Sequence, residues 1–492
     1  MDRLTTLPAP QPPTATNTPP TALVIVCGLV VSALAFVLPG GAVYLCFGVA
    51  LLFAWLYLCW RFPFPALCCV AVLGMCQGLI KQVFNWSQFT YVGLDIPWVL
   101  FLAVWLVRRV KARHNTTFGI VDLLLVIFFA WSALETFNPN LPSPFMAIGA
   151  LRNRLLPMLF FWVGKDLLNP QRSHRLLLIC LLVAGVGGIL GLYEWTLGSA
   201  GIAKLGPGFV PRTSLNWQDA AGQGHLRPLS IYQDGGMAAL FTALMACLAL
   251  NTWDTYSRRV KVWVVASGLL CVAFVAVSGV RAAVLCGGAG LLITVLMNPK
   301  KYLRPVALIA VVTVMVTMSG ASEMGDRYKT IANPLAAYQQ NRGHTLDAAS
   351  HTLQEAPLGI GTGSATTSAS MYVELLAPGT KVGTYQSDNA FAVLLAEGGF
   401  FLTLLYIFLL GAILYTAWQE RIPRGKAPLL APVLVVYCTL LLTFSFTLLV
   451  IDWQPANILF WVLAGSLVAG KAAGYQKREA VARQTGRGYQ EI

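Results

Sequence analysis

The chain has 492 residues, of which 57% are hydrophobic and only 11% are charged. Charged residues make up about a quarter of a soluble domain, so this composition excludes a soluble fold and indicates an integral membrane protein. The net charge of +14 does not indicate a nucleic-acid partner, because the basic residues lie between apolar runs rather than along one face.

The first 22 residues are rich in Pro and Thr, and no basic segment directly precedes an apolar core. This pattern predicts a disordered cytoplasmic tail at 1–22 rather than a cleaved signal peptide. All eleven cysteines lie inside apolar runs and form no C-x-x-C pair of a zinc site. We therefore expect them to be small core residues.

Apolar runs suited to crossing a bilayer recur along the chain and predict an all-α integral membrane protein, a polytopic bundle of about 14 transmembrane helices. The first eleven fall in 23–319 and the last three in 388–470. The predicted spans are 23–38, 42–59, 66–83, 95–107, 119–134, 150–164, 176–197, 235–250, 262–279, 282–297, 305–319, 388–417, 428–450 and 456–470. A pair of the shorter runs could instead form a re-entrant segment. The count depends most on the breaks at Pro39–Gly41 and Ser278–Gly279.

The distribution of Lys and Arg predicts the orientation of this bundle. With the N-terminus in the cytoplasm, every inner connection carries at least three basic residues. These connections are Arg108–Arg113, Lys165–Arg175, Arg258–Lys261, Lys300–Arg304, Arg421–Lys426 and the basic cytoplasmic tail at 471–492. The outer connections at 39–41 and 451–455 carry none. By the positive-inside rule, both termini are predicted to be cytoplasmic.

Two outer loops, 198–234 and 320–387, are too long to be plain connections, and long loops are usually functional. Within the second, a helix is expected from about Gly343 to Glu355, where Pro357 ends it. One face of this helix is polar and consists of His344, Asp347, His351 and Glu355. A metal site or a catalytic base could use this ridge, but no fourth ligand is evident. We expect a solvated face and no bound metal.

A glycine-rich stretch follows that helix, at Gly359-Ile360-Gly361-Thr362-Gly363. No strand precedes it and the G-K-[ST] ending of a phosphate-binding loop is missing. The sequence therefore favours a flexible turn after Pro357.

Several arginines on the predicted outer side are not explained by topology. The candidates are Arg152, Arg154, Arg227, Arg281 and Arg342, with Arg212 and Arg327 nearby. Arg281 is the most informative because it lies directly between two apolar runs, where a cation costs roughly 2.5 kcal/mol or more. The guanidinium group is a planar fork suited to phosphate oxygens. Snorkelling to headgroups, or ion pairs with Asp219, Asp234 or Asp388, is the alternative for the others.

The candidate acids are Asp388 and Glu397, both on the predicted span 388–417. Asp388 would lie at the N-terminus of that helix, where a carboxylate is favoured by the helix dipole. It is therefore either a helix cap or a catalytic group, and Asn389 is a second candidate for the cap.

The order of these features resembles the O-antigen ligase/polymerase family of polytopic membrane glycosyltransferases. Four short motifs, over residues 225–400, carry the resemblance. They are His225-Leu226-Arg227-Pro228-Leu229-Ser230, Ser278-Gly279-Val280-Arg281, Arg342 followed by Glu355-Ala356-Pro357-Leu358-Gly359-Ile360-Gly361, and Ser387-Asp388-Asn389 with Ala396-Glu397-Gly398-Gly399.

The resemblance implies a GT-C-like fold with a large, partly helical periplasmic loop. It also implies transfer of a glycan from undecaprenyl diphosphate, without metal or cofactor, in the bacterial inner membrane. Arg227, Arg281 and Arg342 match family arginines, and Arg152 and Arg154 would assist them with the diphosphate. The base would be Asp388, with His344 and His351 as alternatives. The partners would be the lipid-linked glycan, membrane lipids, a flippase and a chain-length regulator, and no nucleic acid.

The chain departs from the family at Asp388, because the ligase branch typically has His before that Asn. This difference favours a polymerase of repeat units over a ligase. A secondary transporter of an anionic solute is the alternative class, but such folds place charges near the midplane in two related halves, and no halved repeat is found here. An inactive assembly scaffold would leave Arg281 unexplained.

Overall fold

The computed structural model describes residues 40–87, 90, 93–112, 117–209, 217–218, 224–225, 227–303, 305–307, 339, 347–365, 389–420, 430–445 and 454–485. The chain divides into two units, Met1–Ala66 and Leu67–Ile492. In the first unit, helix α2 (Gly40–Arg61) contains the predicted span 42–59, and the Tyr57 and Phe62 rings form a T-shaped pair. The predicted span 23–38 lies outside the described residues.

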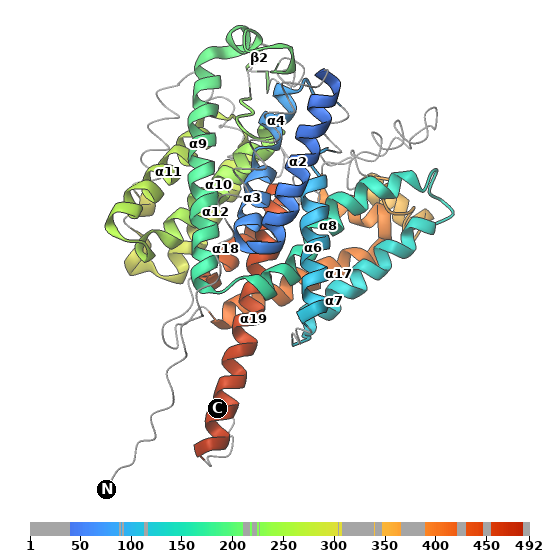
Figure 1. Cartoon of the computed structure of the whole chain (residues 1–492), viewed down its shortest axis with the longest axis vertical. Helices are drawn as coiled ribbons and strands as arrows, with labels where there is room; N and C mark the ends of the chain where they lie inside the picture. Colours follow the sequence, from blue (N-terminus) through green and yellow to red (C-terminus); the bar gives the residue numbers. More distant parts are fainter. Residues whose placement is uncertain are drawn as a thin grey trace. The chain divides into compact units, whose positions relative to one another are not determined.

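The second unit contains the site and is built almost entirely of helices (Figure 1). Helix α3 (Pro63–Met75) leads into it. The helices that follow are α4 (Gln77–Val83), α6 (Ile96–Ala112), α7 (Ile120–Leu134), α8 (Phe145–Leu167), α9 (Pro170–Ala203), α10 (Gly235–Thr252), α11 (Arg258–Val277), α12 (Arg281–Met297), α17 (Ala390–Glu420), α18 (Leu430–Ser445) and α19 (Gln454–Thr485). Short 3-10 helices occupy Glu135–Phe137, Pro207–Phe209 and Trp253–Thr255. Two-residue strands, β1 (Trp217–Gln218) and β2 (Gly224–His225), pair antiparallel with Trp217 opposite His225.

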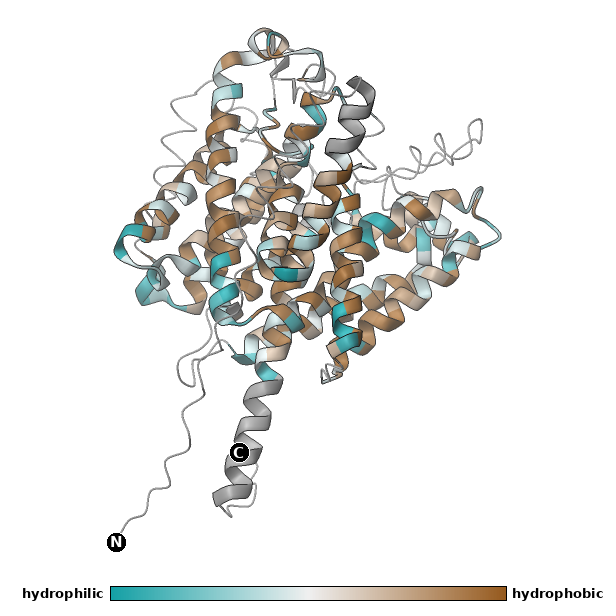
Figure 2. Ribbon diagram, in the orientation of Figure 1, coloured by the Kyte–Doolittle hydropathy of each residue, from teal (hydrophilic) through white to brown (hydrophobic). Residues whose placement is uncertain are grey.

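The helices are mostly apolar along their length, as Figure 2 shows. Within the described residues, five helices are long and apolar enough to cross a membrane. They are Ile120–Phe137, Pro170–Gly198, Gly235–Thr255, Arg258–Val277 and Ala390–Glu420. The bent pair α3 and α4 makes a sixth if it is one span, and four shorter apolar helices accompany them. The prediction of an all-α membrane protein is confirmed, whereas the count of about fourteen spans stays a prediction.

Two predicted spans are broken. The run 66–83 forms two helices bent by 60° around Cys76, and α4 packs on the non-helical segment before α10. There Leu79 N–H donates to the Ile231 carbonyl at 3.1 Å, and Gly78 lies directly against the Tyr232 backbone. Helix α17 is interrupted at Gly398–Gly399, where Gly399 has φ 65°, a conformation that glycine adopts at little cost.

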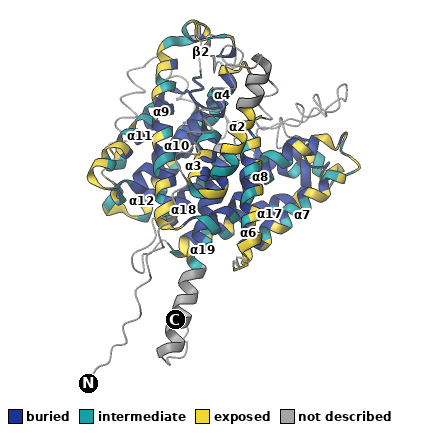
Figure 3. Cartoon of the chain, in the orientation of Figure 1, coloured by how far each residue is buried: buried dark blue, intermediate teal, exposed yellow. Residues whose placement is uncertain are grey.

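Helix α10 is the centre of the second unit. Nearly all of its residues from Gly235 to Thr252 are buried, and it packs against α9, α11, α12 and α18 (Figure 3). A helix that is apolar on every side suits such a position, because no polar face has to reach water.

Helices α8 and α19 approach so closely that their backbones touch. A Cβ added to Gly164 would lie 2.0 Å from the Val462 carbonyl oxygen, and one added to Gly465 would lie 1.9 Å from that of Phe161. Small residues permit this approach in membrane bundles, where van der Waals packing drives helix association. The reciprocal glycines therefore fix α8, which carries two of the candidate arginines.

The turn 278–280 connects α11 to α12. Helix α12 runs parallel to α10, because Gly287 lies against Ala243 and Gly290 against Cys247. Helix α9 finishes where α10 begins, and the end of α7 contacts the first part of α17 through Trp131 and Gly398. The start of α8 links these two regions at one end of the bundle. We call this end of the bundle the motif end, because Arg281 begins α12 there and Asn389 caps α17 there. We call the other end of the bundle the opposite end. The break that the sequence indicates at Ser278–Gly279 is therefore a turn between two helices.

Candidate functional site

A buried ion pair joins α8 to α17 near the motif end. Arg154 Nη1 lies 2.9 Å from Glu397 Oε2, and the two side chains are 1% and 0% exposed. Both groups were singled out from sequence, but their pairing was not predicted. Burying a charge is costly unless it is paired, so each group offsets the desolvation of the other.

The glycine-rich loop closes over this pair and over the break in α17. The interruption at Gly398–Gly399 removes the intrahelical donors that the carbonyls of Ala396 and Glu397 would otherwise use. The loop supplies replacements, because Ile360 N–H donates to the Ala396 carbonyl at 2.8 Å and Gly361 N–H to the Glu397 carbonyl at 3.1 Å. The loop and the helix break therefore form one structural unit.

The same loop is anchored to the end of α7. Thr362 N–H donates to the Glu135 carbonyl at 3.2 Å, and Asn138 Nδ2 bridges the Glu135 carboxylate at 2.7 Å and the Gly359 carbonyl at 3.0 Å. Gly363 has φ 92° and lies against the Met146 backbone, where an added Cβ would be 2.3 Å from a carbonyl oxygen. The expectation of a flexible turn was wrong, because the loop is buried and held by hydrogen bonds at both ends.

A second ion pair lies two residues along α8. Arg152 Nη2 donates to Asp95 Oδ1 at 2.6 Å, just before α6. Lys81 of α4 interacts electrostatically with Asp95 and donates from Nζ to Gln233 Oε1 at 2.8 Å. These contacts connect α8, α6 and α4 with the non-helical segment before α10.

Arg227 is half-buried and lies in that non-helical segment. The segment is held from α9, since the Glu194 carboxylate accepts hydrogen bonds from the N–H groups of Leu229 and Ser230, each at 2.8 Å. At its other end Asp234 caps α10, because its Oδ1 accepts from Gly236 N–H at 2.8 Å. Asp234, one of the acids that could have paired with an arginine, thus serves as a helix cap.

Arg281 is the first residue of α12 and is half-buried. The turn that delivers it is well defined: Ser278 Oγ donates to the Val275 carbonyl at 2.8 Å, Val280 N–H donates to Ser278 Oγ at 3.2 Å, and Gly279 has φ 66°. This turn places Arg281 at the start of α12.

Asn389 caps α17. Its Oδ1 accepts from Phe391 N–H at 2.9 Å and from Ala392 N–H at 3.1 Å, so the second of the two cap candidates is confirmed. Asp388, His344 and Arg342 lie outside the described residues.

His351 belongs to the polar ridge, and this ridge faces away from the core where it is described. The His351 side chain is 71% exposed and lies 3.6 Å from Glu355, one helical turn away. Ala349 of the same helix is fully buried. Across the described ranges no group of three or more His, Cys, Asp or Glu side chains could hold a metal ion. The absence of a metal in the reaction stays a prediction.

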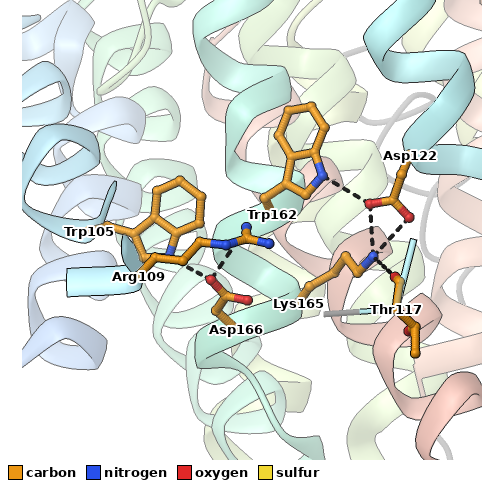
Figure 4. A network of polar contacts seen from close by, with 7 residues as sticks. All are labelled: Trp105, Arg109, Thr117, Asp122, Trp162, Lys165 and Asp166. Atoms are coloured by element: carbon orange, nitrogen blue, oxygen red, sulfur yellow. Dashed lines mark hydrogen bonds and ion pairs between the residues drawn. The ribbon is translucent and has the colours of Figure 1, made fainter. Parts of the chain in front are cut away.

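Figure 4 shows a separate polar network on α8, towards the opposite end. Lys165 Nζ lies 2.8 Å from both Asp122 oxygens and donates to the Thr117 carbonyl, while Trp162 Nε1 donates to Asp122 at 2.9 Å. Beside it, Asp166 accepts from Trp105 Nε1 at 3.1 Å and pairs with Arg109 at 3.5 Å. This network fastens α6, α7 and α8 together.

Sequence reasoning missed Glu194, Asp95 and Lys81. Glu194 and Asp95 lie within predicted spans. An acidic residue inside an apolar span indicates a functional site, so the sequence did contain a pattern that could have identified both. Their partners are backbone amides and side chains from distant segments, which no local pattern reveals.

Apolar helices with arginines, buried carboxylates and a packed glycine loop at one end define a multi-pass membrane protein with a polar site at that end. Residues 265–407, from α11 into α17, match the family model described as O-antigen ligase (Wzy_C). This match confirms the resemblance to the O-antigen ligase/polymerase family and supports a glycosyltransferase-type enzyme that acts on a lipid-linked glycan. It includes Arg281, His351 and Glu397, whereas Arg152, Arg154 and Arg227 precede it. None of the curated proteins matches the chain.

Proposed function

We propose that the protein is a polymerase that joins polyprenyl-diphosphate-linked oligosaccharide repeat units at the outer face of the bacterial cytoplasmic membrane. The observation that carries the proposal is the O-antigen ligase match, because it includes the turn that places Arg281 and the α17 segment that holds Glu397. We further propose about fourteen spans in a GT-C-like arrangement, with both termini in the cytoplasm and the motif end outside.

In this proposal, arginines hold the donor diphosphate. Negative charge develops on the leaving group as the glycosyl bond breaks, and preorganised cations lower that barrier. We assign direct contact to Arg227, Arg281 and Arg342. Arg152 and Arg154 face Asp95 and Glu397, so they support the site and would reach the diphosphate only by exchanging those partners.

We propose Asp388 as the base that accepts the proton of the acceptor hydroxyl, with His344 and His351 as alternatives. The alternative role for Asp388 was to cap α17, and Asn389 caps that helix. Direct attack by the hydroxyl would invert the anomeric centre. No metal or other cofactor takes part in this scheme.

A ligase, or an oligosaccharyltransferase with another acceptor, would use the same donor site. We favour the polymerase because Asp388 stands where the ligase branch typically has His. A transporter of an anionic solute is the second alternative. A flippase and a chain-length regulator are the protein partners we propose.

The decisive experiment is to incubate purified protein in detergent with a lipid-linked oligosaccharide, chelator, and no nucleotide sugar or ATP. We expect products that are longer by whole repeat units. Arg281→Ala should abolish them, whereas Arg258→Ala, an exposed arginine at the start of α11, should not. Transfer only to an added lipid A core would establish the ligase, and no transfer to either acceptor would contradict the proposal.

A further inference from the structure

Glu194 is a buried carboxylate inside a helix that is long and apolar enough to cross a membrane, and it is 7% exposed. Burying a charge there is costly unless hydrogen bonds compensate. One of its oxygens, Oε2, accepts from two consecutive backbone N–H groups, those of Leu229 and Ser230. A single side chain of α9 thus fixes two peptide groups of the segment that carries Arg227.

The fixed segment has a conformation that needs support. Ser230 has φ 57°, which is unfavourable for a residue with a Cβ, and its hydroxyl donates to the Gly187 carbonyl of α9. Gly187 and Glu194 are two helical turns apart and therefore lie on the same face of α9. Gly187 leaves room for the segment, because an added Cβ would lie 3.1 Å from the Ile231 side chain.

The position of Arg227 depends on this support. Leu229 follows Arg227 by two residues, and the chain then folds back until Gly235 lies against Arg227. A Cβ added to Gly235 would be only 2.9 Å from the Arg227 Cβ. The backbone of Arg227 is therefore held between the start of α10 and the two peptide groups that Glu194 fixes.

We propose that Glu194 is the positioning residue for Arg227, and that it orients this arginine towards the donor diphosphate through the backbone of Leu229 and Ser230. The inference rests on the proposed function. It assigns to Glu194 no contact with the substrate and no proton transfer.

Two conservative variants test separately whether the length of the Glu194 side chain or its negative charge is needed. Glu194→Gln keeps an oxygen at the same distance, and a carbonyl oxygen has two lone pairs, so both hydrogen bonds can form without the charge. Glu194→Asp keeps the charge but withdraws it by one methylene. We expect the Gln variant to behave like the wild type and the Asp and Ala variants to lose function.

The test uses the full-length protein in detergent, with undecaprenyl diphosphate as a glycan-free probe. Glu194→Ala and Glu194→Asp should weaken its binding on the order of tenfold to a hundredfold, as misplacement of a binding group does. In an Arg227→Ala background Glu194→Ala should weaken binding no further, since the two act through one contact. Ser173→Ala is the matched control, because it removes a buried hydrogen bond from the other end of the same helix.

Hydrogen exchange supplies a readout that does not depend on substrate. The amides of Leu229 and Ser230 should exchange faster in Glu194→Ala and Glu194→Asp, but not in Glu194→Gln or Ser173→Ala. If Glu194→Ala is not recovered folded, the Asp and Gln variants decide the question.

The outcomes distinguish the two proposals. If the wild type does not bind the probe, or Arg227→Ala leaves binding unchanged, the assigned donor site is wrong and the inference falls with it. If Arg227→Ala weakens binding but Glu194→Ala and Glu194→Asp do not, the inference alone is overturned. Additive losses in the double variant, or a loss in Glu194→Gln as large as in Glu194→Ala, would also overturn it.

Discussion

Helix α8 carries two buried ion pairs, and they differ in what surrounds them. Near the motif end, Arg154 meets Glu397 beside the break in α17 and beneath the glycine loop. Eleven residues further, Lys165 meets Asp122, and this pair receives added hydrogen bonds from Trp162 and from Lys165 to the Thr117 carbonyl. The second pair links regular helices, whereas the first links a helix to irregular backbone.

This difference suggests that the Lys165–Asp122 pair holds helices together, whereas the Arg154–Glu397 pair supports the proposed site. Irregular backbone at membrane depth is tolerated when its polar groups are satisfied within the protein. The loop around Gly361 and the carbonyls of Ala396 and Glu397 satisfy each other in this way. Such a costly arrangement would be unnecessary for stability alone, because the opposite end achieves it with regular helices. We therefore propose that the chemistry takes place at the motif end.

The strongest test of this assignment is the pair of variants Asp388→Asn and Asp122→Asn. Asp388→Asn should lower repeat-unit transfer by about 10²- to 10⁴-fold, as loss of a general base does, with the amount of folded protein unchanged. Asp122→Asn makes the same chemical change at the opposite end, and the transfer rate per folded molecule should be retained. If Asp388→Asn made as much polymer as the wild type, Asp388 would have only a structural role.

At Arg281, Lys and Ala variants should both fail. Removing a preorganised charge that stabilises the leaving group costs about 10²- to 10³-fold in rate, and an ammonium cannot reproduce the bidentate fork. Donor turnover would be measured at equal membrane protein levels, with Arg258→Lys as the control. If Arg281 only snorkels to headgroups, Lys also reaches them, so full synthesis by Arg281→Lys would remove it from the donor site.

Replacing each ion pair by apolar residues sharpens the comparison. Single variants Glu397→Leu and Asp122→Leu should each lower the free energy of unfolding by about 3 to 5 kcal/mol, because each breaks a buried ion pair. The double variants, Arg154→Met with Glu397→Leu and Lys165→Met with Asp122→Leu, should regain much of that stability. Only the motif-end double variant should remain at least about tenfold impaired in transfer. Equal transfer rates in the two double variants would contradict a functional difference between the two ion pairs.

Gly363→Ala tests whether the loop is packed as described. Its φ of 92° and the carbonyl oxygen 2.3 Å from an added Cβ should make Ala cost about 1 to 3 kcal/mol in stability. Gly411 of α17 has nothing within 4 Å of an added Cβ, so Gly411→Ala should be neutral or gain about 0.5 to 1 kcal/mol. Thermal unfolding in detergent measures both, and similar values would show that the loop is not constrained.

Cysteine labelling determines which end faces outward and should leave activity unchanged. Cysteines at Ser199 and Thr384 should react with an impermeant thiol reagent added to intact cells, and one at Thr255 should not. The prediction follows from the Lys and Arg distribution. Labelling of the cysteine at Thr255 would invert the map and place the site on the cytoplasmic side.

Apolar runs predicted most helix positions well. A helix that crosses or fills such a bundle has to be apolar along its length, regardless of which helices it packs against. The run 235–250 became α10, Gly235–Thr252, and 119–134 became α7, Ile120–Leu134. The breaks in α17 and around Cys76 were missed, since hydropathy is continuous across both. They depend on backbone contacts with residues 360–361 and 231–232, which are remote in sequence.

For the site, sequence order located Arg281 and the cap at Asn389, because both depend on local helix starts. It could not locate the partner of Arg154, which is 243 residues away. It also missed Glu194, whose hydrogen-bond partners are peptide groups and therefore leave no trace in residue identity.

The spacing of the two ion pairs has a consequence for biosynthesis. Lys165 follows its partner by 43 residues, so Asp122 already exists when Lys165 is made. Arg154 precedes Glu397 by 243 residues, and at about 5 to 20 residues per second the ribosome needs about 12 to 50 s to supply that partner. During this interval the Arg154 guanidinium lacks the Glu397 carboxylate, and an arginine costs about 2.5 to 3.5 kcal/mol at the centre of a membrane helix. We therefore expect nascent α8 to remain beside the translocon, a chaperone or lipid headgroups until α17 is made.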